Sequence, residues 1–177
     1  FVLKRFEAVT TLQIYLLITG IGLIAIGFVP ANLIIASIAV MGFGYSGVQV
    51  VTYLLLGQVI DEDEVRTGVR REGSYFGANA LVTKPAQSLA ATLTASVLAA
   101  AHFVTRESNG GQIFLNQPES ALFGIRAIVG IIPGATLLIA ALVLFLFPLT
   151  GRHLAEVKEK MLEMHAEKHA KLLEQEG

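Results

Sequence analysis

The chain has 177 residues, of which 54% are hydrophobic and 15% are charged, and its mean hydropathy is +0.65. This composition excludes an ordinary water-soluble domain and indicates a membrane protein. The lack of cysteine excludes disulfides and thiolate metal sites, and a net charge of −1 gives no basis for expecting a nucleic-acid partner.

Stretches without charged side chains predict where the chain crosses the bilayer. No charged residue lies between Glu7 and Asp61, and Pro30 divides this stretch in two. Because backbone polar groups in lipid must be satisfied within the segment, long apolar runs favour helices, whereas barrel strands alternate polar and apolar residues. We expect an all-α membrane protein with a transmembrane region over 1–150 and four helices over about 8–29, 32–60, 74–103 and 121–148.

Polar side chains recur along the second expected helix. Tyr45, Gln49 and Tyr53 follow one another at helical spacing. Gly44 and Gly47 lie on the same helix and would let a neighbouring helix approach closely. The polar stripe either joins helices through hydrogen bonds or lines a cavity, and the spacing leaves both interpretations open.

A dense group of charges follows the second expected helix and begins with four successive acids, Asp61 to Glu64. The C-terminal end of a helix disfavours negative charge, so we expect Arg70 and Arg71 to pair with these acids. Asp61 and Glu64 also have the spacing of a capping box, which predicts a short separate helix at the membrane surface. The segment is either a solvated loop or an ion-pair latch to another cytoplasmic loop, made in one conformation and broken in another.

Lys84 is the residue of the third expected helix that is hardest to explain by structure alone. It lies about 15 Å from the start of this helix, near the middle of the bilayer. A charge at this depth costs about 3 kcal/mol, so it should face a bundle interior or a water-filled cavity and have a partner. Gln87 and Ser88 share its face, and Pro85 can kink the helix. A structural pair with a carboxylate of another helix is the alternative to a role in binding or coupling.

The last part of the chain contains a further membrane helix and a polar tail. Arg126 lies about two turns inside the fourth expected helix and can extend to the nearer membrane surface. Residues 151–177 have an amphipathic pattern, which predicts a solvated or membrane-surface helix in the cytoplasm. His165, Glu167 and His169 suggest a metal site, because histidines four residues apart can face one ion. However, the segment lacks the zincin order and no third ligand on that face is evident, so we expect no metal site.

Lysine and arginine gather on one side of this four-helix topology. The positive-inside rule places that side, with both ends of the chain, in the cytoplasm of a multi-pass protein of the cell membrane. Residues 105–120 then form an external loop, which contains Arg106. The cations on the cytoplasmic side are Lys4, Arg5, Arg66, Arg70, Arg71, Arg152, Lys158, Lys160, Lys168 and Lys171.

The segment DEDEVRTGVRREGSYFGANALVTK, residues 61–84, resembles the loop and following helix of melibiose-carrier transporters. These are the glycoside/pentoside/hexuronide:cation symporters of the major facilitator superfamily. The ending FPLT, residues 147–150, is also similar to the end of the family's twelfth helix, so the resemblance assigns the chain to helices nine to twelve. The family pattern falls on Asp61, Glu64, Gly68, Arg70, Glu72 and Lys84.

The resemblance implies a secondary active transporter that moves a sugar, glycoside or related small solute together with Na⁺ or H⁺. Transport would proceed by alternating access between two six-helix halves. The chain begins at Phe1, and we expect the amino-terminal half and the cation-binding carboxylates to lie outside it. No other cofactor is expected. The residues assigned to the substrate and cation cavity are Lys84, Gln87, Ser88, Asn79, Tyr45, Gln49 and Tyr53.

The resemblance also assigns an inner ionic gate to the charged segment. Its members would be Asp61, Glu64, Arg70 and Glu72. The sequence differs from many sugar carriers at Gln58, where they often have an acid, so the ion pairs of the gate would be arranged differently.

Other classes of protein fit the sequence less well. The only ionisable groups inside the expected helices are Lys84 and Arg126, so we expect no enzyme. A structural membrane subunit would not need a lysine at mid-membrane beside a polar stripe. Lysophospholipid symporters of the same family are a further alternative, which nothing in the sequence separates from sugar carriers. The expected partners are a small molecule, a coupling cation, the bilayer and the rest of the transporter.

Overall fold

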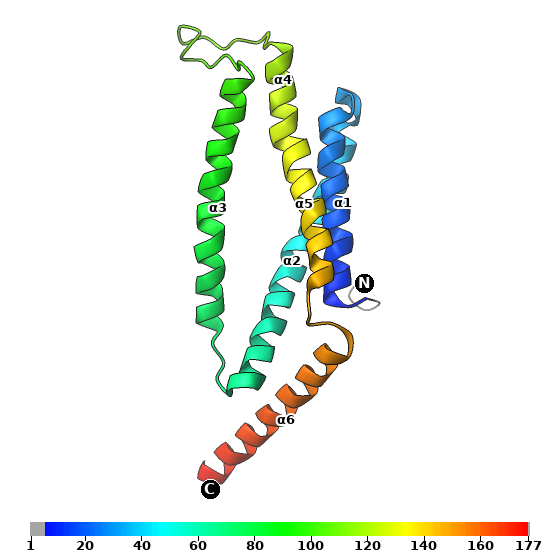
Figure 1. Cartoon of the computed structure of the whole chain (residues 1–177), viewed down its shortest axis with the longest axis vertical. Coiled ribbons are helices and arrows are strands. Elements are labelled where there is room, and N and C mark those ends of the chain that lie inside the picture. Colours follow the sequence, from blue (N-terminus) through cyan, green and yellow to red (C-terminus); the bar gives the residue numbers. More distant parts are fainter. Residues whose placement is uncertain (1–5, 177) are drawn as a thin grey trace.

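The computed structural model describes residues 6–176, and in these residues the ordered segments are all helical. The helices are α1 (Ala8–Phe28), η2 (Ala31–Leu33), α2 (Ile34–Thr67), α3 (Glu72–Ala100), α4 (Glu119–Arg126), η3 (Ala127–Ile131), α5 (Ile132–Val143), η4 (Leu144–Leu146) and α6 (Gly151–Glu176). In Figure 1, α1, α2 and α5 gather on one side of the molecule and α3 stands apart on the other.

Three helical segments in the described part of the chain are long and apolar enough to cross a membrane. They are α1, α2 and the segment Glu119–Leu146, which comprises α4, η3, α5 and η4. By length and composition, these segments agree with the expected membrane protein with several crossing helices. The 29 residues of α3 provide enough length for a fourth crossing, but its polar residues make it less apolar. The crossing by α3 stays a prediction.

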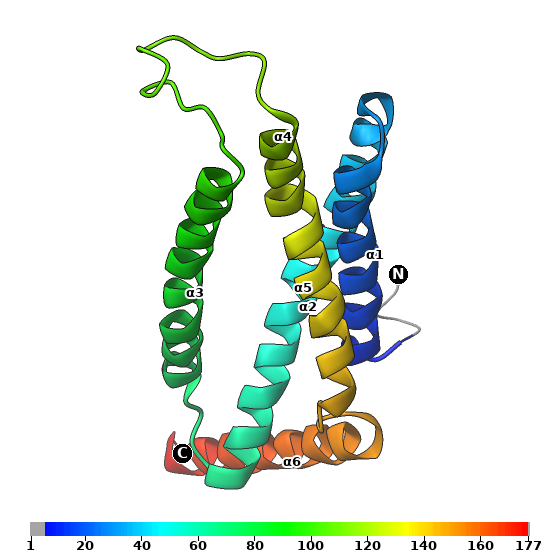
Figure 2. The same ribbon diagram turned by 45° about the horizontal axis from the view of Figure 1, so that its top comes forward.

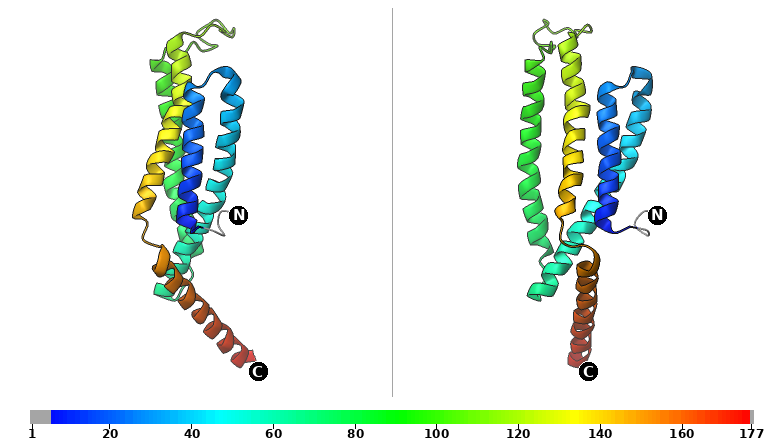
Figure 3. Two further views of the ribbon diagram at one scale, coloured as in Figure 1. Left: turned by 90° about the vertical axis from the view of Figure 1, so that its right-hand side faces the viewer. Right: turned by 45° about the vertical axis from the view of Figure 1, so that its right-hand side comes forward.

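The helices turn back on one another, so that loops gather at two ends of the molecule. The α2–α3 connection, the start of α1 and α6 lie at one end, and residues 101–118 form a long loop at the other (Figures 1 and 3). Contact between the start of α1 and α6 is direct, because the N–H of Gly151 donates to the Glu7 carboxylate at 3.1 and 3.2 Å. This arrangement agrees with an even number of crossings.

The core lies between α1, α2 and α5. Its buried members include Leu12, Leu16, Val51, Leu55 and Ala141. In lipid the hydrophobic effect gives little attraction between helices, so close packing has to hold them together.

Glycines allow this close approach on both sides of α1. Gly47 packs on the ring of Tyr15, and a Cβ at Gly44 would lie 2.5 Å from Thr19 Oγ1. On the other side, a Cβ at Gly134 would lie 2.8 Å from the carbonyl oxygen of Gly20. The expectation that Gly44 and Gly47 permit close contact is confirmed.

The fourth expected helix, over about 121–148, is not one continuous α-helix in the structure. A π-helical turn, Ala127–Ile131, separates α4 from α5, and η4 adds a final 3-10 turn. Pro133 is the second residue of α5, just after the π turn, and has no N–H to donate to the carbonyl four residues earlier, which accounts for the irregularity. In α3, by contrast, Pro85 lies inside the helix and does not interrupt it.

The expected boundary at the end of the second helix is wrong. Instead of ending near residue 60, α2 continues through Asp61 and Glu64 to Thr67, so the predicted short helix with a capping box does not form. Gly68 ends the helix in the left-handed conformation, with φ of 73°, and its N–H donates to the Glu64 carbonyl at 2.8 Å. The other helix ends differ from expectation by only a few residues.

The tail helix α6 packs under the end of α2. Leu149, Leu154 and Val157 form a small buried cluster against Val59 and Val65 of α2. Figure 2 shows α6 lying across the lower end of the molecule. The tail is therefore held against the membrane helices in part, rather than being wholly solvated or lying on the bilayer alone.

Candidate functional site

Arg70 lies at the centre of an ionic cluster at the end of α2. Its Nη1 donates to Asp61 Oδ1 and to Glu64 Oε2, each at 2.9 Å, and its Nε donates to Glu72 Oε1 at 2.6 Å. These carboxylates, that of Glu72 most strongly, favour the charged guanidinium and raise the pKa of Arg70. The four residues that the resemblance assigned to a gate thus form one set of ion pairs, which we call the Arg70 cluster.

Glu64 is the most buried member of the Arg70 cluster, with a side chain only 3% exposed. It lies beyond the apolar stretch of α2, which ends at Ile60, and receives Lys168 Nζ at 2.9 Å and His165 Nε2 at 3.2 Å. Burial alone would raise the pKa of this carboxyl. Hydrogen bonds from Lys168, Arg70 and His165 outweigh burial and lower the pKa to about 2. Glu64 is therefore ionised at neutral pH.

Two further contacts fix the same end of the molecule. Arg71 binds the Asp63 carboxylate through Nη2 at 2.6 Å and Nε at 3.0 Å, which raises the pKa of Arg71. His153 Nε2 lies 3.1 Å from Glu62 Oε1. The local pairing of Arg70 and Arg71 with the acids is confirmed. The contacts that reach these acids from a distant segment come from α6 and not from another loop, and the making and breaking of a latch stays a prediction.

Sequence reasoning missed the residues that α6 contributes, which are His153, His165 and Lys168. The tail did show a signal, because His165 and Lys168 are three residues apart and share a helix face with Leu154 and Val157. The apolar periodicity marked this face as one that packs, but it did not show what the face packs against.

The polar face of α3 points away from the helices of this chain. No residue of α3 is buried, and Lys84, Gln87 and Ser88 are all exposed, as is Asn79. Within the described residues, Lys84 makes no ion pair and no side-chain hydrogen bond. The expectation that it faces a partner and a shared cavity stays a prediction.

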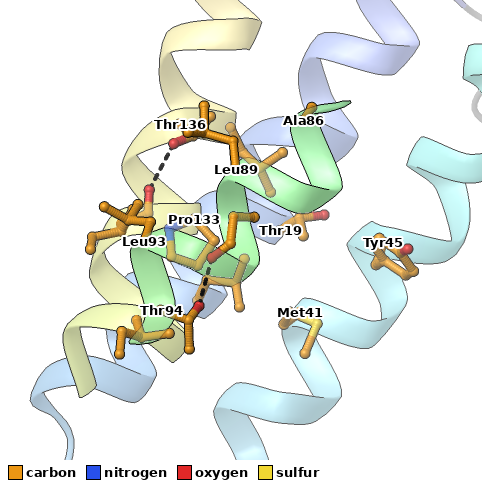
Figure 4. Close-up of a pocket in the computed structure, with 14 residues that line it drawn as sticks. Thr19, Met41, Tyr45, Ala86, Leu89, Leu93, Thr94, Pro133 and Thr136 are labelled. Carbon is orange, nitrogen blue, oxygen red and sulfur yellow. Dashed lines mark hydrogen bonds between the residues drawn. The ribbon is translucent and has the colours of Figure 1, made fainter. Parts of the chain in front are cut away.

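The opposite face of α3 is apolar and borders a cavity of about 810 Å³. At about 100° per residue, Ala86 and Leu93 lie on the other side of the helix from Lys84. Figure 4 shows Ala86, Leu89 and Leu93 facing Thr19, Met41 and Pro133 of the neighbouring helices. Among the described residues this cavity separates α3 from α1, α2 and α5.

The cavity offers little polar chemistry. The hydroxyls of Thr94 and Thr136 donate to carbonyls of their own helices, each at 2.9 Å (Figure 4). Tyr45 also lines the cavity, and its hydroxyl accepts a hydrogen bond from Gln49 at 2.6 Å.

The residues assigned to one substrate cavity do not all meet in this structure. Tyr45 is the only one of them that borders the apolar cavity among the described residues. Tyr53 instead contacts Phe76 of α3, with ring centroids 6.5 Å apart. Lys84 and the polar stripe of α2 are therefore not joined in one pocket by this chain alone.

The three long apolar helical segments point to a multi-pass membrane protein. Residues 3–151 match the family described as MFS/sugar transport protein, and the chain belongs to this family. It is 28% identical over 128 residues to an uncharacterized symporter of Synechocystis sp., covering 72% of this chain and 23% of that protein. It is 23% identical over 134 residues to the glucuronide carrier protein homolog of Escherichia coli, covering 76% and 27%.

The chain thus spans about a quarter of the length of these relatives. No solved structure matches it. The family and both relatives are described as transport proteins, which agrees with the expectation that the chain is not an enzyme.

Proposed function

We propose that the chain forms helices nine to twelve of a secondary active transporter of the melibiose-carrier type. The complete protein moves a sugar, glycoside or related small solute together with Na⁺ or H⁺ by alternating access. The family match and the printed names of the two relatives, a symporter and a glucuronide carrier homolog, support this proposal. The transmembrane region is 1–150, and residues 151–177 form a tail helix, with both ends in the cytoplasm and the protein in the plasma membrane.

The observation that carries the proposal is the exposed polar face of α3. A lysine facing lipid at mid-membrane would cost about 3 kcal/mol, so the rest of the bundle has to cover Lys84 or to enclose water beside it. Gln87 and Ser88 add hydrogen-bonding groups to the same face. This face then borders the substrate path between the two halves, with Lys84 close to the substrate and the coupling cation.

The Arg70 cluster forms the inner ionic gate in this proposal. Glu64, with its pKa near 2, keeps its charge at any physiological pH. It therefore suits a permanent electrostatic latch, and it does not suit a group that carries the coupling proton. Cation-binding carboxylates are expected in the amino-terminal half of the transporter.

The test is uptake by the full-length protein in proteoliposomes, with Na⁺ and H⁺ gradients imposed separately. A panel of labelled glycosides and sugars should give uptake that depends on one of these gradients, and Lys84→Ala should reduce it to background while expression persists. Val82→Ala is the matched control, because Val82 lies on the opposite, exposed face of α3. Uptake by Lys84→Ala at the wild-type level would contradict the role of Lys84.

A lysophospholipid symporter is the second candidate, and the apolar cavity favours it. The cavity has a volume of about 810 Å³ and is lined mainly by apolar side chains such as Leu89 and Leu93, which suits an acyl chain better than a sugar. Uptake of a labelled lysophospholipid under the same gradients, with no uptake of any glycoside, would select this alternative. A structural subunit finds no such support.

A further inference from the structure

Two histidines connect the tail helix α6 to α2. His153 Nε2 lies 3.1 Å from Glu62 Oε1, and His165 Nε2 lies 3.2 Å from Glu64 Oε1. The side chains of these histidines are 50% and 44% exposed, so both exchange protons with water. The apolar contact beneath them is small and involves Leu149, Leu154 and Val157 of the tail segment. Polar contacts therefore provide a large share of the attachment.

A neutral imidazole can still donate one hydrogen bond, but a protonated one adds attraction to a carboxylate. Histidine is the side chain whose charge ordinarily changes between about pH 5 and 8. We propose that α6 is a proton-sensitive strap: protonation of His153 and His165 tightens its docking on α2, and loss of these protons loosens it. The sign follows from the partners, since both histidines face acids.

The charges around His165 weaken its response. Glu64 already binds Lys168 of α6 and Arg70 of the α2–α3 loop, so a proton on His165 adds a third cation to one carboxylate. Lys168 is a second contact of α6 with the same carboxylate, so loss of the proton from His165 removes only part of the attachment at this end of the tail.

The surroundings of His153 favour a larger response. It shares a small cavity with Glu62 and Arg66 of α2 and with Glu156 and Lys160 of α6. Glu156 is paired with Arg152 at 2.9 Å, and the Glu7 carboxylate of the segment before α1 accepts the Gly151 N–H. Glu62 binds His153 in the structure, so this contact should carry most of the pH dependence.

The strap goes beyond the proposed transport function and does not depend on it. Docking of α6 brings Lys168 and His165 to the buried carboxylate of the Arg70 cluster. A change of pH at this end of the molecule would thus alter the number of cations that hold Glu64, without any change in substrate.

The experiment measures the distance between α2 and the tail in the full-length protein. Leu54→Cys and Leu173→Cys, both at exposed positions, carry spin labels in a background without other cysteines. Pulsed dipolar spectroscopy then gives the docked and undocked populations. We expect the docked-to-undocked ratio to be about fivefold higher at pH 5.5 than at pH 8, since two partly exposed pairs each contribute modestly.

Variants identify the responsible groups. His153→Gln should remove most of the pH response, and the double variant with His165→Gln should remove all of it. His169→Gln, at an exposed position of α6 with no side-chain hydrogen bond or ion pair in the described residues, is the matched control and should respond as the wild type does. A ratio that does not change with pH in the wild type, or a double variant that responds like the wild type, would overturn the proposal.

A second substitution guards against misfolding of the glutamine variants. His153→Lys places a permanent cation opposite Glu62, so docking should be high at both pH values with little response remaining. If this variant still responds to pH like the wild type, His153 is not the sensor and the proposal fails.

Discussion

The charged side chains of the Arg70 cluster have partners within this chain, whereas the charged side chain on the polar face of α3 has none among the described residues. In the cluster, Arg70 contacts three carboxylates and α6 supplies additional cations, so the charges are paired within this chain. On α3, Lys84 is exposed and the described residues provide it with no partner. The contrast shows that the charges of the Arg70 cluster find their partners within the described residues, whereas the charge of Lys84 on α3 does not. In the proposed transporter, the rest of the bundle supplies the surface that covers Lys84.

The largest expected effect tests whether water reaches the polar face of α3. In a cysteine-free full-length protein, Lys84→Cys should react with a water-soluble thiol reagent at least about tenfold faster than Val82→Cys, because the thiolate forms only where water is present. Reaction rates in intact membranes provide the measurement. Equal rates at the two positions would show that water reaches both faces of α3 equally.

A smaller effect is expected when the charge of the cluster is reduced. Glu64→Gln leaves Arg70 and Lys168 with one carboxylate fewer at a buried position. We expect a loss of about 1 to 2 kcal/mol in the free energy of unfolding, since these cations are themselves nearly half exposed and partly screened. Thermal unfolding in detergent measures it. Glu72→Gln, at a more exposed carboxylate, is the control and should have a smaller effect.

Acid should weaken the cluster in a defined direction. The pKa of Glu64 is lowered from 4.5 to about 2 by folding, so its contribution to stability is complete above pH 4.5 and is lost as the pH falls toward 2. The unfolding temperature of the wild type should therefore fall over this range more than that of Glu64→Gln. Parallel curves for the two proteins would show that another group causes acid unfolding.

The smallest effect is expected for Arg71→Gln. The Arg71–Asp63 pair has two short hydrogen bonds, but it lies at the surface, where water and salt screen the attraction. The unfolding temperature should fall less than for Glu64→Gln, and added salt should reduce the difference from wild type. An equal or larger fall would place the main support of the loop at Asp63 rather than at Glu64.

The sequence predicted the features that depend on local composition. Except at the end of α2, gaps between charges located the ends of the apolar helices to within a few residues, because the cost of charge in lipid is high. The association of Asp61, Glu64, Arg70 and Glu72 was also predictable, since all four lie within a short segment.

The contacts between distant segments at the end of α2 were not predicted. The acids at the end of α2 suggested a break in the helix, but Arg70, Arg71 and Lys168 bind three of them and favour its continuation. The docking of α6 joins residues about a hundred positions apart, as His165 and Glu64 show. Amphipathic periodicity reveals that a face is covered, and it contains no information about the distant segment that covers it.

The continuity of α2 has a mechanical consequence. Its 34 residues form one rod about 51 Å long, which carries Tyr45 beside the apolar cavity and Glu64 in the ionic cluster. A tilt of such a rod by about 10° displaces one end relative to the other by about 9 Å if the helix stays straight. Because α2 is one uninterrupted helix, a tilt of the end that contacts α6 would also move the part of α2 that borders the cavity.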